Sequence, residues 1–412
     1  MNNVTRTVNC RRLFLTLSVL VAVALFSAPA QATPPVTVYC GQTLTHSVKL
    51  ANDLSNCPNN GLVVGADNVT VDLNGHTIDG DGERVTDCPG FPGPDCDVGV
   101  QNTGGYNGVT IEGGKVREFA YGVEVFGGAS DNRVRGIAAT RNLFRGILVG
   151  GGITDSQVER NSTTDNGAGI VLCCFSNNVR IERNSVSGNG DGIVVRGSDN
   201  NLIAHNSVSG NTDIGEGSEG SGIGIEGNDN EVSHNRVHGN ADNIGVFGNR
   251  NRVTANEVTD PVGCPGEQPG ELGCGHGIQL GGGEGNLLAN NRVFGALSDN
   301  ISVDSFDPDN PTVGTAVRRN LVRDAGVDGI SVGTDVNGIP AATTDTLILR
   351  NTATGAGDDG IDVDSVATTL TRNGAFRNDD LGIEAVPGVT DGGGNRAAGN
   401  GNPLQCTNVF CR

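Results

Sequence analysis

The chain has 412 residues, including 65 glycines, and its 27 basic and 47 acidic residues give a net charge of −20. This charge argues against nucleic acid or an anionic lipid surface as a partner, because their phosphates would repel it. It would repel an anionic sugar chain as well, unless Ca²⁺ or a local basic patch intervened. The glycines recur periodically, which indicates a repeat protein and not a disordered chain.

Residues 1–32 have the pattern of a secretory signal peptide. Arg11 and Arg12 precede an apolar run that ends at Phe26, and Ala30-Gln31-Ala32 follows as a cleavage motif of small residues. The run is short for a membrane span and is soon interrupted by proline. We therefore expect cleavage near Ala32 and a monomeric mature chain without a membrane span, either secreted or held in the periplasm or at the cell surface.

Ten of the 11 cysteines follow the signal, an even number that suits a disulfide-forming compartment. Metal binding is a weaker interpretation, because no Cys-x2-Cys spacing occurs. Cys173 and Cys174 are adjacent, which leaves a vicinal disulfide and two buried thiols as alternatives. Four disulfides are expected between cysteines close in sequence: Cys40–Cys57, Cys88–Cys96, Cys264–Cys274 and Cys406–Cys411.

A repeat of 22 or 23 residues, lengthened by insertions in places, runs through the chain. Gly-Ile or Gly-Val units begin short apolar segments at twelve positions: Val100, Val123, Ile147, Ile170, Ile193, Ile223, Ile244, Ile278, Ile301, Ile330, Ile361 and Ile383. Asparagines that close apolar segments form a second series, in which amides are expected to hydrogen-bond from one repeat to the next: Asn161, Asn184, Asn206, Asn235, Asn256, Asn291, Asn320, Asn351 and Asn373.

Each repeat offers two or three short strands with alternating apolar residues, and one repeat cannot bury its apolar face alone. Stacked coils are therefore expected. The predicted fold is all-β, a single-stranded right-handed parallel β-helix (solenoid) of about twelve coils over residues 61–390. Residues 33–60, with a capping strand from Thr43 to Leu54, and residues 391–412 are expected to cap its open ends.

The segment Asn74-Gly75-His76-Thr77-Ile78 and the recurring Gly-Ile-x-Val units resemble bacterial parallel β-helix repeat proteins of the pectate-lyase-like superfamily. The resemblance covers nearly all of the mature chain. It implies the fold, and a superfamily that contains polysaccharide lyases, glycoside hydrolases, epimerases, accessory proteins and adhesins. A shared fold does not select among these functions.

Acidic residues recur two positions before the repeat isoleucine, where five successive coils carry Asp242, His276, Asp299, Asp328 and Asp359. Stacked coils would place neighbouring side chains roughly 4.8 Å apart, a separation that suits the paired carboxyl groups of a glycosidase. We therefore predict Asp299, Asp328 and Asp359 as catalytic, and His276 and Asp362 as substrate-binding. Aspartate before glycine is also a common turn residue whose carboxylate caps the backbone, and this alternative stays open.

The oxygen-rich face could instead hold Ca²⁺, which prefers six to eight oxygen ligands. Asp304 and Asp364 are the predicted ligands. A second predicted substrate-binding surface contains Tyr121 and Arg145, an aromatic ring and a cation suited to a uronic acid.

Insertions are expected to wall a groove beside the acidic residues. They cover residues 79–97, 212–221 and 260–275 before the repeat strand, and residues 305–315 and 334–345 after it. Loops on a rigid scaffold are frequent binding elements.

The sequence thus predicts a secreted protein that binds or acts on extracellular or cell-wall polysaccharide through this groove. If it is an enzyme, polysaccharide lyase and glycoside hydrolase are the expected classes. A non-catalytic structural or adhesin-like solenoid is the alternative.

Overall fold

A computed structural model describes most of the chain after residue 33. The signal pattern and the predicted pairs Cys88–Cys96 and Cys264–Cys274 lie outside the described residues. The described ranges are 34–83, 97–212, 220–263, 275–305, 307–333 and 342–412. They form strands and turns, with no helix long and apolar enough to cross a membrane among them.

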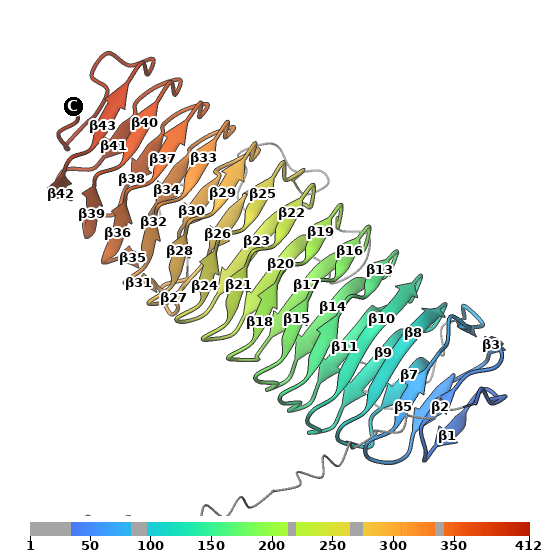
Figure 1. Ribbon diagram of the computed structural model, residues 1–412. Coiled ribbons are helices and arrows are strands. Elements are labelled where there is room, and N and C mark those ends of the chain that lie inside the picture. The colour runs from blue at the N-terminus through green and yellow to red at the C-terminus, as the bar shows by residue number, and fades with distance from the viewer. Residues whose placement is uncertain (1–33, 84–96, 213–219, 264–274, 306, 334–341) are drawn as a thin grey trace, which may run out of the picture. The chain divides into compact units, whose positions relative to one another are not determined.

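Fourteen parallel strands form the first long sheet, here called sheet 1 (Figure 1). Its strands are β1 (Gln42–Leu44), β4 (Leu62–Val64), β7 (Val98–Asn102), β9 (Tyr121–Phe126), β11 (Arg145–Gly150), β14 (Ala168–Cys173), β17 (Asp191–Arg196), β20 (Ser221–Glu226), β23 (Asp242–Phe247), β26 (Ile278–Leu280), β30 (Ile301–Val303), β34 (Ile330–Val332), β38 (Ile361–Val363) and β41 (Ile383–Ala385).

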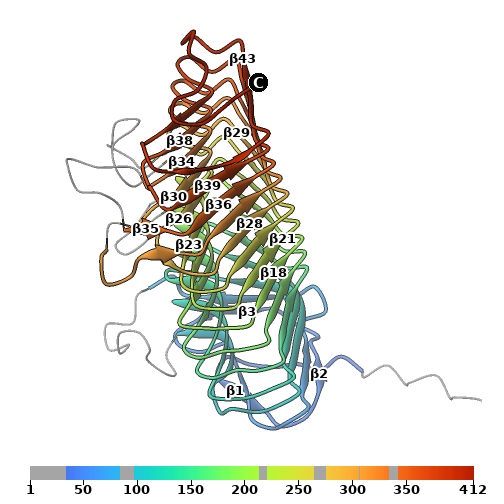
Figure 2. The ribbon, with the colours of Figure 1, turned by 90° about the vertical axis from the view of Figure 1, so that its left-hand side faces the viewer.

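Sheet 2 lies along another side of the stacked coils, as Figure 2 shows for β28, β36 and β39 relative to β26, β30 and β38. Its strands are β2 (Val48–Lys49), β5 (Thr70–Asp72), β8 (Thr110–Arg117), β10 (Arg133–Thr140), β12 (Gln157–Glu159), β15 (Arg180–Glu182), β18 (Leu202–Ala204), β21 (Glu231–Ser233), β24 (Arg252–Thr254), β28 (Leu287–Ala289), β32 (Ala316–Arg318), β36 (Thr346–Leu349), β39 (Thr368–Thr371) and β42 (Thr390–Gly393).

Sheet 3 completes each coil, and the long strands β8 and β10 run through both sheet 2 and sheet 3. Its other strands are β3 (Leu54–Cys57), β6 (Thr77–Gly80), β13 (Ser162–Thr164), β16 (Ser185–Ser187), β19 (Ser207–Ser209), β22 (Arg236–His238), β25 (Glu257–Thr259), β29 (Arg292–Phe294), β33 (Leu321–Arg323), β37 (Thr352–Thr354), β40 (Gly374–Phe376) and β43 (Arg396–Ala398). A small sheet of β27 (Gly283–Glu284), β31 (Thr312–Val313) and β35 (Thr343–Thr344) follows sheet 1 in three coils.

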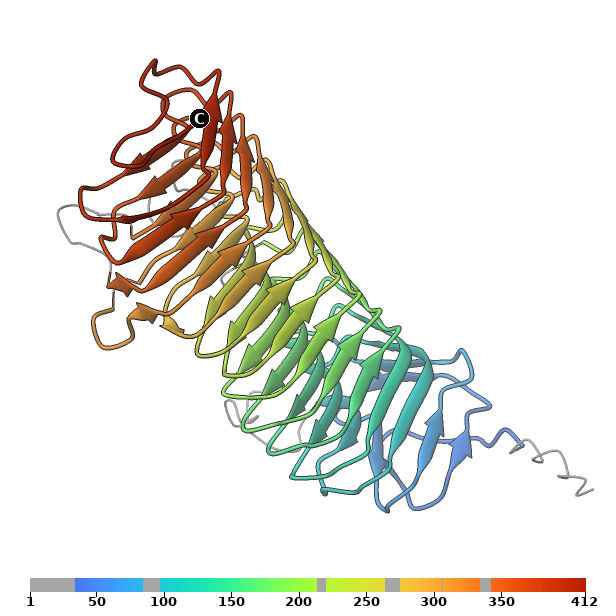
Figure 3. The same ribbon diagram turned by 60° about the vertical axis from the view of Figure 1, so that its left-hand side comes forward.

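The predicted register is confirmed at every step. Val100 pairs with Val123, and the series continues without a slip to Ile361 beside Ile383. Sheet 1 has fourteen strands where about twelve coils were expected, because β1 and β4 precede the first Gly-Val unit. The parallel stacking of the strands is visible in Figure 3.

One continuous apolar core runs inside the coils. In β17, Ile193 and Val195 are completely buried, and the same inward positions in neighbouring strands carry valine, leucine or isoleucine. Full burial of such a side chain stabilises the fold by roughly 1.5–3 kcal/mol. Because each coil covers its neighbours' apolar residues, the repeat and not local propensity determines the fold.

The predicted asparagine series is also confirmed. The Nδ2 and backbone N–H of Asn161 both donate to Oδ1 of Asn184, at 3.1 and 2.9 Å. The same pattern continues coil by coil to Asn395. These side chains are buried, and they satisfy backbone groups at the corner between sheets 2 and 3 that would otherwise lack partners.

The two ends differ in detail from the expected caps. The capping strand predicted from Thr43 to Leu54 is divided into β1, β2 and β3, which pair with β4, β5 and β6, so coil pairing begins inside residues 33–60. In residues 391–412, β43 pairs with β40, and single bridges join Cys406 to Ile383 and Cys411 to Asn395. The disulfides Cys40–Cys57 and Cys406–Cys411 are present as predicted, and Cys173 is bonded to Cys174, which decides that alternative for a vicinal disulfide.

Candidate functional site: an acidic face on sheet 1

The outward residues of sheet 1 change character along the stack. Leu148, Val171 and Val194 are apolar and buried, whereas the later strands carry polar residues in register. This polar row consists of Gln279, Ser302, Ser331, Asp362 and Glu384. Together with the aspartates that precede the strands, it forms what we call the acidic face, over β23 to β41.

The stacked aspartates accept backbone hydrogen bonds. Asp299 Oδ1 accepts the N–H of Asp328 at 3.0 Å, and Asp328 Oδ1 accepts the N–H of Asp359 at 2.9 Å. Asp242 and Asp359 accept in the same way from His276 and Leu381. These aspartates therefore do cap the backbone of turns, as the alternative interpretation of the sequence expected. Each of these coils has one such carboxyl group.

Burial raises the pKa of these carboxyl groups, since each is surrounded by protein and by other acids. Desolvation raises the pKa of Asp299 to about 6, although the charge of His276 opposes this. The pKa of Asp328 rises to about 9 through burial and the charges of Asp299 and Asp362. At neutral pH, Asp328 consequently retains a proton.

His276 lies between two of these carboxylates. Its Nδ1 is 3.7 Å from Asp242 Oδ1 and its Nε2 is 4.0 Å from Asp299 Oδ2. Burial opposes protonation of the ring, but the nearby carboxylates of Asp242, Asp299 and Asp304 raise the pKa of His276 overall. The histidine thus offsets part of the negative charge at the start of the acidic face.

Three carboxylates meet at the later end of the acidic face. Asp359, Asp362 and Glu384 each offer an oxygen, and these oxygens lie within 4.8 Å of one another. Burial and then a side-chain hydrogen bond with Glu384 raise the pKa of Asp359 to about 8. Burial and the charges of Asp364 and Glu384 raise the pKa of Asp362 to about 7. We call this group the carboxyl triad.

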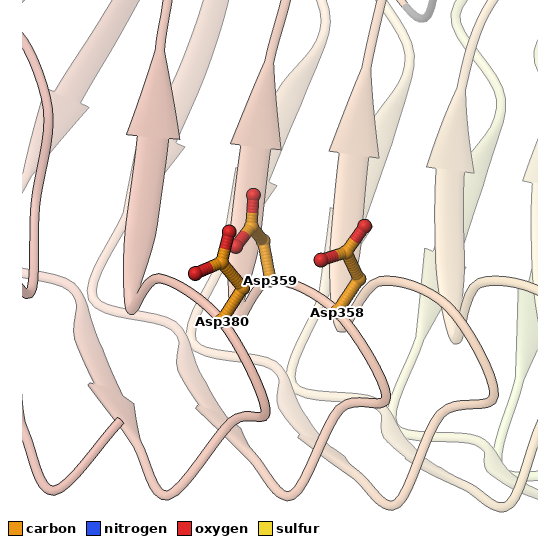
Figure 4. A group of neighbouring side chains, drawn as sticks. All are labelled: Asp358, Asp359 and Asp380. Atoms are coloured by element: carbon orange, nitrogen blue, oxygen red, sulfur yellow. The ribbon is translucent and has the colours of Figure 1, made fainter. Parts of the chain in front are cut away.

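A second acidic group shares Asp359. Asp358 comes from the same turn as Asp359, and Asp380 comes from the turn of the next coil (Figure 4). Each offers an oxygen, and these oxygens lie within 4.8 Å of one another. Burial and the charge of Asp380 raise the pKa of Asp358. Asp359 is therefore the residue common to both acidic groups.

The predicted calcium ligands lie beside the triad without joining it. Asp304 Oδ1 accepts the N–H of Gly333 at 3.0 Å, and its other oxygen accepts from the Ser302 hydroxyl, so its carboxylate already serves protein donors. Asp364 acts on the triad through its charge, which contributes to the raised pKa of Asp362. Among the described residues, the groups with metal-ligand spacing are the triad and the Asp358 group.

Tyr121 and Arg145 pair in register on β9 and β11, far along the stack from the acidic face. Tyr121 is 7% exposed and packs against Phe144, with ring centroids 5.7 Å apart. Burial lowers the pKa of Arg145. The structure places both in a partly apolar cluster, so Tyr121 does not present an open ring to a sugar.

The predicted groove walls can be followed only in part, because much of the five insertions lies outside the described residues. In the described portions, β31 and β35 pair beside the acidic face, and Ala342 N–H donates to Ser305 O at 2.6 Å. The described parts of the last two insertions therefore extend the coils through β31 and β35.

Glu384, Asp358 and Asp380 were not assigned to the site from the sequence. Asp358 and Asp380 lie outside the aspartate column. The signal was available, since Ser331, Asp362 and Glu384 follow the repeat isoleucine directly and pair in register.

Comparison with known proteins gives a family match for residues 98–260, described as "Right handed beta helix region". Among solved structures, the A-module of mannuronan C-5 epimerase AlgE6 from Azotobacter vinelandii is 16% identical with a TM-score of 0.44, over 85% of this chain and 88% of that chain. DFA-IIIase from Arthrobacter chlorophenolicus A6 is 13% identical with a TM-score of 0.41, over 86% and 88% of the two chains.

The catalytic domain of a GH87 alpha-1,3-glucanase is 12% identical with a TM-score of 0.48, over 91% of this chain and 62% of that chain. No curated protein sequence matches the chain. At such low identity these structures are similar in fold alone. Together with the stacked parallel sheets, the match over residues 98–260 shows that the chain has the right-handed parallel β-helix fold.

Proposed function

We propose that this is a secreted enzyme that binds extracellular or cell-wall polysaccharide along the acidic face and hydrolyses its glycosidic bonds. The observation that carries the proposal is the carboxyl triad, in which buried Asp359 and half-buried Asp362, both with raised pKa, stand beside the exposed side chain of Glu384. Two carboxyl groups with different environments are what glycoside hydrolysis requires.

The chemistry follows from those environments. Asp359 or Asp362 donates its proton to the glycosidic oxygen as the bond to the anomeric carbon breaks, and Glu384 attacks that carbon. Water then cleaves the glycosyl ester, giving its proton to the residue that acted as acid. The oxygens within 4.8 Å of one another favour this retaining route, which uses carboxyl groups roughly 5–5.5 Å apart.

The other predicted site residues support the triad from neighbouring coils. Asp299 and Asp328 are buried and hold the turns in register, and the charge of Asp299 contributes to the raised pKa of Asp362. Their role in this proposal is to position the triad and help it retain a proton. We assign His276, at the other end of the acidic face, a part in binding the sugar chain.

Calcium is the competing occupant of the triad. Three carboxylates within 4.8 Å could bind Ca²⁺ in place of protons, and a bound cation would also bridge an anionic sugar chain to the acidic face. Hydrolysis through a protonated carboxyl group predicts activity without Ca²⁺ and inhibition by it. Activity restored by Ca²⁺ after chelation would favour the metal.

The test is release of reducing sugar from a panel of neutral and acidic polysaccharides, with chelator and with Ca²⁺. Glu384→Gln and Asp359→Asn are expected to lose at least about a hundredfold in rate, since acid–base catalysis typically contributes roughly 10²–10⁴-fold. Glu257→Gln, an exposed glutamate on sheet 3, is the matched control. Equal rates in Glu384→Gln and the control would refute the proposed nucleophile.

One observation favours a second candidate, a non-catalytic binding or structural solenoid. Each stacked aspartate already accepts a backbone N–H, which is sufficient reason for its presence. This candidate predicts no hydrolysis of any polysaccharide. If it binds sugars, retention on a glycan array survives Asp328→Asn and Asp359→Asn; if it is a spacer, there is no retention.

Secretion is part of the proposal. The signal pattern of residues 1–32 supports it, and so do the disulfides Cys40–Cys57 and Cys406–Cys411, which persist in oxidising compartments. The amino terminus of exported protein should follow Ala32. Protein found in the cytoplasm with residues 1–32 still attached would contradict secretion.

A further inference from the structure

The corner between sheets 2 and 3 carries a series of cationic residues that are not part of the acidic face. Each buried asparagine of the series follows a residue with positive φ, a conformation that favours Gly, Asn or Asp. Five of the ten corners nevertheless carry arginine there, a residue that this backbone conformation does not favour. They are Arg160, Arg183, Arg319, Arg350 and Arg372, whose φ angles are 55–56°.

Near the last coils this corner opens into a pocket of about 400 Å³. Arg350 and Arg372 lie on successive corners, where the Arg350 N–H donates to Thr371 O and the Arg372 N–H donates to Gly393 O, both at 3.0 Å. Arg396 joins them from β43, which is two coils beyond β37 in sheet 3. Arg350, Arg372 and Arg396 therefore all line one cavity.

Two glycines keep the pocket open. Gly394 replaces the corner arginine in the following coil, and a Cβ there would lie 3.1 Å from Arg372 Cγ. Gly374 occupies the outward position between Thr352 and Arg396, and a Cβ there would lie 2.8 Å from the Phe376 ring. The ring of Phe376, half-buried, thus lies against Gly374 and lines the pocket with an apolar surface.

The three arginines have no acidic partner among the described residues, although arginines elsewhere pair across coils, as Arg250 does with Asp229 at 2.7 Å. Asp391, on the neighbouring β42, accepts from the N–H groups of Gly393 and Phe410 and from Asn395. In a chain of net charge −20, a pocket with three such cations is an attractive site for an anion.

We propose that this pocket binds an acidic saccharide, with its carboxylate or sulfate between Arg350, Arg372 and Arg396 and its ring against Phe376. Guanidinium groups bind carboxylate and sulfate through paired hydrogen bonds, and an aromatic face suits the apolar face of a sugar. The pocket lies at the corner between sheets 2 and 3, away from the outward face of sheet 1. The proposal is therefore independent of hydrolysis at the triad.

The test is calorimetric titration of the full mature chain with an oligogalacturonate in the presence of chelator, which removes any Ca²⁺ bridge to the acidic face. A neutral oligosaccharide of equal length and inorganic sulfate and phosphate are the comparison probes. Binding of the oligogalacturonate that weakens with added salt is expected, with much weaker binding of the other three. Equal affinity for inorganic sulfate or phosphate would overturn the assignment to a saccharide.

Variants locate the site. Arg372→Gln and Arg396→Gln should each weaken oligogalacturonate binding by about tenfold or more, equivalent to about 1.4 kcal/mol. Arg183→Gln changes the same corner position several coils away and should leave affinity unchanged. Gly374→Ser introduces the residue that Ser185 and Ser207 provide in other coils and should weaken binding by reshaping the pocket. Equal affinity in Arg372→Gln and Arg183→Gln would refute the site. Loss of binding in Glu384→Gln, which leaves the pocket residues unchanged, would refute it as well.

Discussion

Buried polar side chains in this protein have two different roles. The asparagines donate and accept, so each is satisfied by its neighbours in a chain of hydrogen bonds from coil to coil. The aspartates of the acidic face can only accept when ionised, so stacking them accumulates charge, and burial raises their pKa instead. One corner of the coil therefore carries asparagines that serve the structure, and the corner before sheet 1 carries aspartates that can titrate.

The asparagine series predicts a large effect of a single substitution. In Asn320→Ala, the N–H of Asn291 and the carbonyl of Leu288 lose their partners in the interior. Because each orphaned buried group costs roughly 1–3 kcal/mol, we expect a loss of about 2–5 kcal/mol in the free energy of unfolding. Denaturant titration measures it, with exposed Arg318→Ala as the control. A loss equal to that of the control would contradict the structural role.

The raised pKa of Asp328 predicts how stability depends on pH. Its folded value of about 9 lies above the ordinary 3.8, so the folded state binds the extra proton between these values. The associated stability is present below pH 3.8 and is lost as the pH rises through about 9. Asp328→Asn keeps an acceptor for Asp359 N–H but removes the titration. Between pH 5 and 9, the unfolding free energy of this variant should fall less steeply with pH than that of the unmodified protein. The two slopes should differ by up to about 1.4 kcal/mol per pH unit. Parallel curves for the two proteins would contradict the raised pKa of Asp328.

At the scale of the strand, the repeat made most of the fold predictable. The isoleucine column and the asparagine series follow directly from spacing, because a parallel coil must return each side chain to the same place. The division of the first segment into β1, β2 and β3 was not predictable, since these strands lack the Gly-Ile unit. Glu384 was accessible to register reasoning, whereas the burial of Tyr121 depended on packing that no spacing reveals.

The amino-terminal coil depends on its disulfide. Cys40–Cys57 spans a sequence separation of 17 residues and joins the start of β1 to the end of β3. Replacing both cysteines by serine should cost about 3 kcal/mol at most by loop entropy, and it should increase amide exchange in β1. The Cys406–Cys411 pair, with a separation of 5, should contribute less. A larger effect from the shorter loop would contradict this ranking.

Across the whole stack, stability is a sum of contacts between neighbouring coils, and both functional proposals rely on that rigidity. Ile193→Ala removes buried atoms from β17 in the interior of the stack, at a cost of about 2–5 kcal/mol. Hydrogen exchange should increase in β14, β17 and β20 more than in β41. A uniform increase along all fourteen strands of sheet 1 would instead indicate a single cooperative unit.

The acidic face and the basic pocket give the molecule two sites of opposite charge on the same late coils. The sequence predicted the acidic face because its aspartates share the repeat. It did not predict the pocket, because Arg350, Arg372 and Arg396 come together only through the positive-φ corners and through glycines that leave space beside them.

The hydrolytic mechanism requires that Asp359 or Asp362 holds a proton near neutral pH, and a carboxyl titration followed by NMR measures this. With labelled aspartate and assignment through Asp359→Asn and Asp362→Asn, the signals should change near pH 8 for Asp359 and near pH 7 for Asp362. Both carboxyl groups titrating near the ordinary 3.8 would contradict the proposed acid and, with it, the hydrolytic mechanism.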